Sequence, residues 1–304
     1  MENIKFFLKR LFIFLNLTFL LISLPSFAED KPKGQVELVY VEWSSEVAST
    51  NVVKVLLEMA GYEVEITPVT AAAMWQAAAS KDADAFVAAW LTTTHAHYLE
   101  AVKDKIENLG PNLIGTKIGL VVPSYVSIDS IEQLNDNADK LGKKIIGIDP
   151  GAGLMARTEE ALKAYQINKF KLVEGSGATM AAALSEAIKS HQWIVVTGWT
   201  PHWKFSRWEL KYLKDPKHLY GGEEHIDTIV RLGLKEEQPE VYRLLKNFFW
   251  TATDMEKVMV WNEENGADPY ENAKRWIKEN PDKVNKWLDP SYNKEVDFPK
   301  SYRP

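Results

Sequence analysis

Short apolar runs alternate along this chain with segments whose apolar residues recur every three or four positions. Residues 36–41 have the apolar character of a strand, and residues 48–60 place apolar side chains on one face of a helix that ends at Gly61. The pattern continues with strands at residues 63–67, 85–91, 118–123, 144–149, 170–173, 193–198 and 226–231, and with helices at residues 71–79, 128–141, 154–165 and 179–189. This alternation predicts an α/β fold in which mainly parallel sheets are flanked by helices.

The predicted elements form two successive α/β series with no flexible linker between them. This arrangement predicts two lobes, with the chain crossing between them near residues 121–123 and again near residues 225–229. Lobe I then comprises residues 29–124 and 225–304, and lobe II comprises residues 125–224. Two-lobed α/β proteins of this kind commonly hold a ligand in the cleft between the lobes and close on it by hinge motion.

The N-terminal segment has the pattern of an export signal. A positively charged head precedes an apolar run over residues 11–24, and Ser26 and Ala28 supply the small residues that a signal peptidase needs. We therefore expect residues 1–28 to be a cleavable signal peptide and Glu29 to begin the mature protein. The alternative is a membrane anchor that remains uncut.

The composition narrows the function classes. The 46% of hydrophobic residues excludes a disordered chain, and the absence of cysteine excludes disulfide bridges and a lipid anchor, so we expect a protein free in the periplasm. The chain is acidic, with 42 Asp and Glu residues against 36 Lys and Arg residues, and has no basic block. We expect no nucleic-acid partner, and we expect a monomer.

Tryptophan is the most informative residue type, with 11 copies. Trp43, Trp90 and Trp199 each lie where a predicted strand gives way to a loop, and ligands of open α/β sheets lie beyond the carboxyl ends of strands. Packing in the core remains an alternative for each of these three. For the others we expect ordinary packing, with the indole N–H satisfied at the surface: Trp75, Trp193, Trp203, Trp208, Trp250, Trp261, Trp276 and Trp287.

Several indoles around one cavity suit a quaternary ammonium group, which carries a full charge but has no N–H to donate. A second feature suits an anion. The strand at residues 144–149 leads into a turn with Gly151 and Gly153, and the amides at the start of the next helix are free to bind a carboxylate or phosphate. The alternative is a tight turn that needs glycine only for its backbone conformation.

The sequence also contains candidate residues for metal binding and for glycoside hydrolysis. His95 and His97 have the spacing of a metal-binding pair, but no third ligand follows, so we expect no metal and no cofactor. Glu42 and Glu46 are the candidates for the acid and nucleophile of a glycosidase. We expect Glu42 at a solvated edge and Glu46 in the first turn of a helix. Four hydroxyl residues are expected at the start of that helix, where they would cap it: Ser44, Ser45, Ser49 and Thr50.

Several motifs in order resemble the glycine betaine-binding proteins of ABC importers, and the likeness covers residues 35–288. The motifs begin at Val41 (VEWSSEVASTN), Met74 (MW), Ala89 (AWLTTTH), Gly147 (GIDPGAG) and Thr197 (TGWTPHW). The chain departs from the family at Thr92-Thr93, where Pro-Asn is common, and at Ser44, where Asp is common. These departures bear on the presentation of His95 and on the polar contacts at the rim of the site.

The resemblance implies a role for individual residues. Three indoles would form an aromatic prism around a trimethylammonium group: Trp43, Trp90 and Trp199. His95 would donate a hydrogen bond to the ligand carboxylate, and the backbone amides of Gly153 and Leu154 would bind the same group. The resemblance thus implies a periplasmic binding protein, not an enzyme, that delivers glycine betaine, proline betaine or a similar solute to an ABC permease. A secreted carbohydrate-active hydrolase is the alternative.

Overall fold

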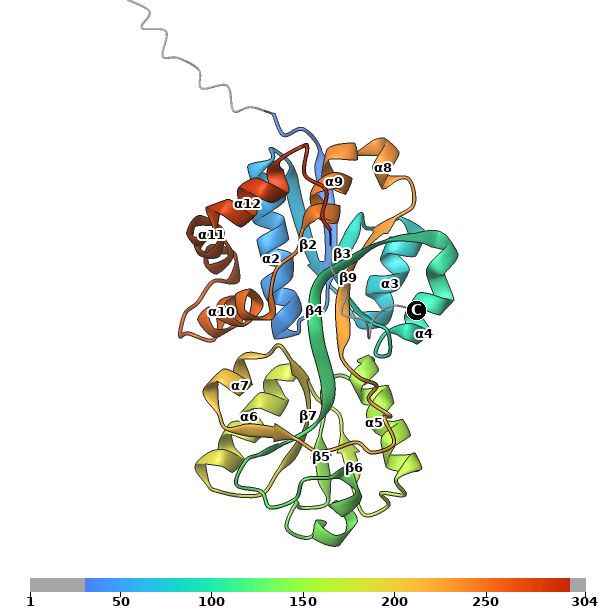
Figure 1. Cartoon of the computed structure of the whole chain (residues 1–304), viewed down its shortest axis with the longest axis vertical. Helices are drawn as coiled ribbons and strands as arrows, with labels where there is room; N and C mark the ends of the chain where they lie inside the picture. The colour runs from blue at the N-terminus through green and yellow to red at the C-terminus, as the bar shows by residue number, and fades with distance from the viewer. Residues whose placement is uncertain (1–30, 296–304) are drawn as a thin grey trace, which may run out of the picture. The chain divides into compact units, whose positions relative to one another are not determined.

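One long strand, β4 (Ile106–Pro123), belongs to two sheets and runs down the centre of Figure 1. It pairs antiparallel with β9 (Glu224–Arg231) as far as Thr116, and with β7 (Val195–Thr200) from Lys117 onward. The computed structural model describes residues 31–295, and within them nine strands are hydrogen-bonded in the order β2-β1-β3-β9-β4-β7-β5-β6, with β8 also on β4. The two halves of β4 therefore serve different groups of elements.

The apolar pattern predicted only residues 118–123 of this strand, because Gly110 and Pro111 interrupt its first half. The structure tolerates them as irregularities, since the pairing with β9 shifts register on both sides of Pro111. The change of partner at residues 116–117 lies N-terminal to the crossing expected at residues 121–123. The second expected crossing lies within β9.

The first sheet contains the expected parallel strands at its outer end. There β1 (Gln35–Tyr40) lies between β2 (Glu63–Pro68) and β3 (Ala85–Leu91), and β3 pairs antiparallel with β9. These strands and their helices form the upper group in Figure 1. The helices are α2 (Ser44–Met59), α3 (Ala71–Ser80), α4 (Ala96–Val102), α8 (Leu234–Glu237), α9 (Pro239–Asn247), α10 (Ala252–Asn262), α11 (Pro269–Glu279) and α12 (Pro281–Leu288).

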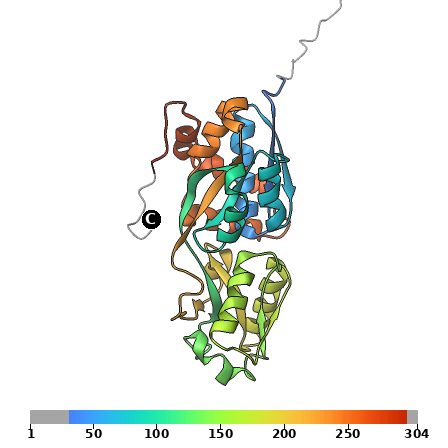
Figure 2. The ribbon, with the colours of Figure 1, turned by 90° about the vertical axis from the view of Figure 1, so that its right-hand side faces the viewer.

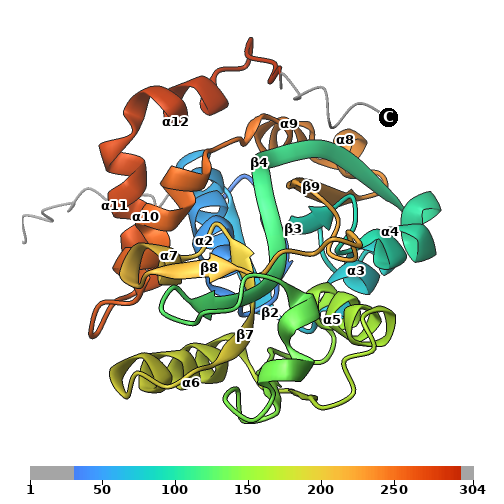
Figure 3. The same ribbon diagram turned by 60° about the horizontal axis from the view of Figure 1, so that its bottom comes forward.

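The second sheet repeats this plan with shorter strands. Strand β5 (Lys144–Ile146) lies between β6 (Lys171–Val173) and β7 in parallel, and β8 (Leu210–Tyr212) pairs antiparallel with β4. Its helices form the lower group in Figures 1 and 2, and Figure 3 shows α7 next to α10 of the first group. They are α5 (Gly153–Ala164), α6 (Gly177–Lys189) and α7 (Trp203–Arg207).

The helix expected over residues 128–141 was wrong. Two short 3₁₀ turns, Ile131–Gln133 and Asn135–Asn137, occupy this segment. Its apolar residues are buried at near-helical spacing, which explains the prediction, but the segment is rich in Asn and Asp, whose side chains compete for backbone groups. Asn135 shows this competition, because its side-chain amide donates to the carbonyl of Gln166 instead of facing solvent from a helix.

Several tryptophans outside the strand ends are buried in the first group, among them Trp75, Trp250, Trp276 and Trp287. Trp276 meets Trp250 edge-on at 5.6 Å and stacks on Trp287 at 5.9 Å between ring centroids. The expectation that such indoles satisfy their N–H at the surface was wrong for Trp75, Trp250 and Trp276, because each Nε1 is buried without a hydrogen-bond partner among the described residues. Their rings contribute through apolar burial alone.

Within residues 31–295, no helix combines the length and the apolar character needed to cross a membrane. The expected signal peptide at residues 1–28 lies outside the described residues.

One buried carboxylate ties three strands of the first sheet together. Asp84 directly precedes β3, accepts a hydrogen bond from the backbone N–H of Glu37 on β1 at 2.9 Å, and pairs with Nε of Arg231 on β9 at 2.7 Å. Asp84 and Arg231 are both 8% exposed, so the pair is largely withdrawn from water. Arg231 also meets the exposed carboxylate of Glu237 at 2.7 Å.

Replacing Asp84 by alanine is expected to lower the free energy of unfolding by about 2–4 kcal/mol, because a buried guanidinium and a strand N–H lose their partner. Urea denaturation of the purified protein measures this loss. Asp82→Ala removes an exposed carboxylate two residues away and is the matched control. Equal stability of the two variants would contradict the prediction.

Candidate functional site

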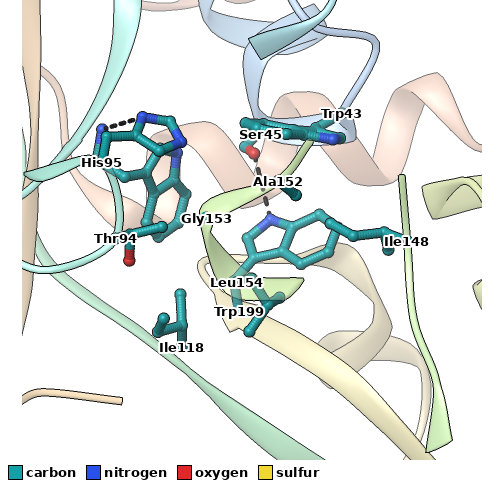
Figure 4. A pocket seen from close by; sticks show the side chains of 11 residues that line it. Trp43, Ser45, Thr94, His95, Ile118, Ile148, Ala152, Gly153, Leu154 and Trp199 are labelled. Atoms are coloured by element: carbon teal, nitrogen blue, oxygen red, sulfur yellow. Dashed lines mark hydrogen bonds between the residues drawn. The ribbon is translucent and has the colours of Figure 1, made fainter. Parts of the chain in front are cut away.

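A small, largely apolar cavity lies between elements of the first and second sheets (Figure 4). The empty space between its walls is about 290 Å³, part of which is open solvent. The structure brings all the expected site residues to this one cavity. Its lining is Trp43, Ser45, Trp90, Thr94, His95, Ile118, Ile148, Ala152, Gly153, Leu154 and Trp199.

The three strand-end indoles come from three different elements. Trp43 follows β1 and occupies the N-cap position of α2, while Trp90 and Trp199 are the penultimate residues of β3 and β7. All three are buried, with exposed fractions of 7%, 3% and 4%. Because they come from loops or ends of different strands, the cavity exists only where the two groups of elements meet.

Each of these indoles donates its N–H to a side chain. Nε1 of Trp43 donates to Asp149 Oδ2 at 2.6 Å, across from the first group to the loop after β5. Nε1 of Trp199 donates to Ser45 Oγ at 3.2 Å in the opposite direction. These hydrogen bonds hold the two rings in defined orientations.

The third indole is held by a buried acid. Nε1 of Trp90 donates to Glu46 Oε1 at 2.7 Å, and Ser45 Oγ donates to Glu46 Oε2 at 2.5 Å. Burial raises the pKa of Glu46 to about 7, with a smaller contribution from Asp149, although its two hydrogen bonds favour the ionised form. The prediction that Glu46 lies in the first turn of its helix is confirmed, but its contact with the cavity wall was not foreseen.

His95 is held as a neutral hydrogen-bond donor. The backbone N–H of Trp90 donates to His95 Nδ1 at 3.2 Å, and burial lowers the pKa of His95 to about 3. A neutral imidazole that accepts at Nδ1 carries its proton on Nε2. Glu224 at the start of β9 holds the same loop, accepting from the backbone N–H groups of Thr93 and Thr94 and from the Thr94 hydroxyl.

The glycine-rich turn approaches the His95 loop very closely. A Cβ at Gly153 would lie 2.1 Å from the carbonyl oxygen of Thr94, so only glycine fits there. Tyr98 on α4 adds a hydrogen bond from its hydroxyl to the Gly151 carbonyl at 2.8 Å. Gly153 and Leu154 begin α5, and no side chain caps this helix start. Its first amides are the kind of donors that bind carboxylates.

Within residues 31–295, the candidate residues for a metal site and for a glycosidase are not gathered into such sites. His97 packs on Tyr98 with ring centroids 4.0 Å apart, and no group of three or more potential metal ligands is gathered within residues 31–295. Glu42 is exposed, whereas Glu46 is buried against Trp90, so the two carboxylates do not share a cleft. The capping role expected for the hydroxyl residues was wrong. Helix α2 begins at Ser44 without a side-chain cap, and Ser49 and Thr50 lie inside it.

Sequence reasoning missed part of the lining: Ser45, Thr94, Ile118, Ile148 and Ala152. Ser45 and Thr94 are sequence neighbours of expected site residues, and that proximity was an available signal. Ile118 had none, because it lies on β4 and reaches the cavity only through the pairing of that strand with Trp199. The complete lining has three π faces and a neutral imidazole, and it has no ionised side chain among the described residues.

Comparisons with known proteins identify the family of the chain. Residues 34–279 match the OpuAC family, the substrate binding domain of ABC-type glycine betaine transport systems. The glycine betaine/carnitine transport binding protein GbuC of Listeria monocytogenes is 51% identical over 156 residues, which cover 51% of this chain and 52% of that protein. The match thus spans about half the length of this curated relative.

Two solved structures match over most of the chain. Lactococcal OpuAC, in its closed-liganded conformation with glycine betaine, is 47% identical with a TM-score of 0.81, covering 84% of this chain and 100% of that one. The glycine betaine/L-proline-binding protein ProX of Borrelia burgdorferi is 40% identical with a TM-score of 0.82, covering 84% and 97%. The fold is that of two-lobed substrate-binding proteins, and the chain belongs to the OpuAC family of substrate-binding domains of ABC-type glycine betaine transporters.

Proposed function

We propose that this protein captures glycine betaine, or a related methylated zwitterion such as proline betaine, outside the cytoplasmic membrane and delivers it to an ABC permease. The observation that carries the proposal is the grouping of three buried indoles around a cavity whose described lining has no ionised side chain. A quaternary ammonium offers no hydrogen-bond donor, so π faces in a desolvated site are its natural partners.

The other end of the cavity supplies the donors that a carboxylate needs. His95 would donate from Nε2, and the first amides of α5, at Gly153 and Leu154, would donate from the backbone. A zwitterion with a methylated cation and a carboxylate would satisfy both ends at once. Carbohydrate hydrolysis gains no support, because the family is one of transport proteins and Glu42 is exposed whereas Glu46 is buried. We therefore propose binding without turnover.

We further propose two lobes that divide where β4 changes partner, between Thr116 and Lys117, and again near the start of β9. The first boundary therefore lies N-terminal to the one expected at residues 124–125, because residues 117–121 pair with β7 of the second sheet. This division puts Trp43, Trp90 and His95 in one lobe and Trp199 with Gly153 in the other. Ligand contacts would then favour the closed arrangement, which is the form a permease would recognise. We infer that the protein works as an exported monomer.

The indoles are the first test. Trp43→Ala, Trp90→Ala and Trp199→Ala are each expected to weaken glycine betaine binding by roughly 1–3 kcal/mol, because each removes a cation–π face. Isothermal titration calorimetry measures the loss, with the melting temperature as a check on folding. Trp193→Ala alters a half-buried indole outside the cavity and is the control. Three cage variants with unchanged affinity would refute the proposed cation site.

The proposed contact between His95 and the ligand carboxylate gives a second test. His95→Ala is expected to weaken glycine betaine binding about tenfold or more while leaving choline binding nearly unchanged, because choline lacks the carboxylate that His95 would serve. His97→Ala, which changes a histidine outside the cavity lining, is the control. Equal losses for both ligands in His95→Ala would argue against the proposed anion end.

The contact between Gly153 and Thr94 gives a third. Gly153→Ala is expected to abolish measurable binding with little loss of stability, because a methyl group at 2.1 Å from the Thr94 carbonyl would hold the lobes apart. In Gly151→Ala the nearest atom to the new methyl lies 3.9 Å away, an ordinary contact, so this variant should bind normally. Small-angle scattering with saturating ligand would show compaction in Gly151→Ala only, and compaction in both variants would contradict the prediction.

A further inference from the structure

A hydrogen-bonded chain of side chains runs behind the cavity and links two of its indoles. It passes from Trp199 Nε1 to Ser45 Oγ at 3.2 Å, from Ser45 Oγ to Glu46 Oε2 at 2.5 Å, and from Trp90 Nε1 to Glu46 Oε1 at 2.7 Å. Glu46 therefore accepts directly from Trp90 and Ser45, and Ser45 in turn accepts from Trp199. Its exposed fraction is 1%, and Ser45 is fully buried.

We propose that Glu46 is a positioning and specificity residue, which orients Trp90 and Trp199 and supplies the negative charge that favours a cation between them. The inference rests on the proposed function, since it concerns the cation end of the same site. It adds a charged group to a cavity whose own described lining has none.

The chemistry of the contact supports a direct effect on cation binding. A carboxylate that accepts the N–H of an indole leaves that ring richer in electrons, and its own charge attracts a cation through a medium of low dielectric constant. Both effects require the ionised acid. A protonated Glu46 keeps its shape but loses the charge, so the two protonation states should differ in affinity.

The ionisation of Glu46 determines how ligand affinity should change with pH. Burial raises the pKa of Glu46 to about 7. A bound cation stabilises the carboxylate and lowers that pKa, so binding should release a proton and tighten as pH rises through 7. The affinity should change about tenfold for every pKa unit by which the ligand lowers the pKa.

Four other titratable groups lie close to Glu46 or to the indoles of the cavity. His95 stays neutral in this range because burial lowers its pKa to about 3, and burial also lowers the pKa of His202. Asp149, across the cavity on Trp43, opposes the ionisation of Glu46. Lys204 is fully buried with Nζ 4.3 Å from the centroid of Trp199, and burial lowers its pKa as well. Lys204 is present in every Glu46 variant. A change in the pH dependence of binding in Glu46→Gln is therefore due to Glu46 and not to Lys204.

The experiment is isothermal titration of glycine betaine and of choline at pH 5.5, 6.5, 7.5 and 8.5. Glu46→Gln preserves the size of the side chain and an acceptor for Trp90 but cannot ionise. Glu42→Gln removes an exposed carboxylate from the same segment and is the matched control. Ser45→Ala breaks the link to Trp199 and leaves the acid in place.

The unaltered protein and Glu42→Gln should bind both ligands several-fold more tightly at pH 8.5 than at pH 5.5. Glu46→Gln should lose that dependence for both ligands and bind at or below the low-pH affinity. Ser45→Ala should weaken binding and retain the pH dependence. Retention of the normal pH profile in Glu46→Gln would overturn the inference.

A measurement on the unaltered protein covers the case in which Glu46→Gln fails to fold. Titrations at pH 7 in buffers of different ionisation enthalpy count the protons released on binding, and neither ligand has a proton to release in this range. A release of a substantial fraction of a proton is expected, and binding without release would overturn the inference alone. Failure of the unaltered protein to bind either ligand would overturn the proposed function together with it.

Discussion

The antiparallel pairing of β4 with two different strands is the constraint on which the site depends. Up to Thr116 its hydrogen bonds hold the first sheet, and from Lys117 they hold the second, so the two groups of elements share one continuous backbone. Gly115 lies at this junction with a φ of +85°, a conformation that side chains rarely adopt. The cavity draws its walls from both groups, so the arrangement of its lining depends on how the two sheets are joined at this junction.

The indoles of the cavity differ from those of the core in one physical respect. Trp43, Trp90 and Trp199 each donate their N–H to a side chain, although burial alone would hold them in place. The core indoles of Trp250 and Trp276 are equally buried and lack such a partner among the described residues. A core ring gains from any well-packed orientation, whereas a ring that binds a cation must present its face. The hydrogen bonds from the three cavity indoles fix the direction in which each ring faces, which the core indoles do not need.

Much of the fold and of the candidate site follows from local pattern. Trp90 and Trp199 were identifiable because an apolar strand ends in an indole, and Gly153 because a strand leads through a glycine turn into a helix. The failures have non-local causes. Glu46 looks like an ordinary first-turn acid until the indole of Trp90, on another strand, is seen to lie against it. The first half of β4 was not predicted, because only its pairing with β9 makes Pro111 part of a strand.

The departure from the family at Thr92-Thr93 is accommodated by a contact that also reaches the junction between the sheets. Glu224 accepts hydrogen bonds from the backbone N–H groups of Thr93 and Thr94, which fixes the loop that carries His95. Glu224 is also the first residue of β9 and lies opposite Thr116, where β4 changes partner. The loop is thus held by its backbone, whatever side chains stand at residues 92 and 93. The same carboxylate therefore connects the loop that carries His95 to the point at which β4 passes from one sheet to the other.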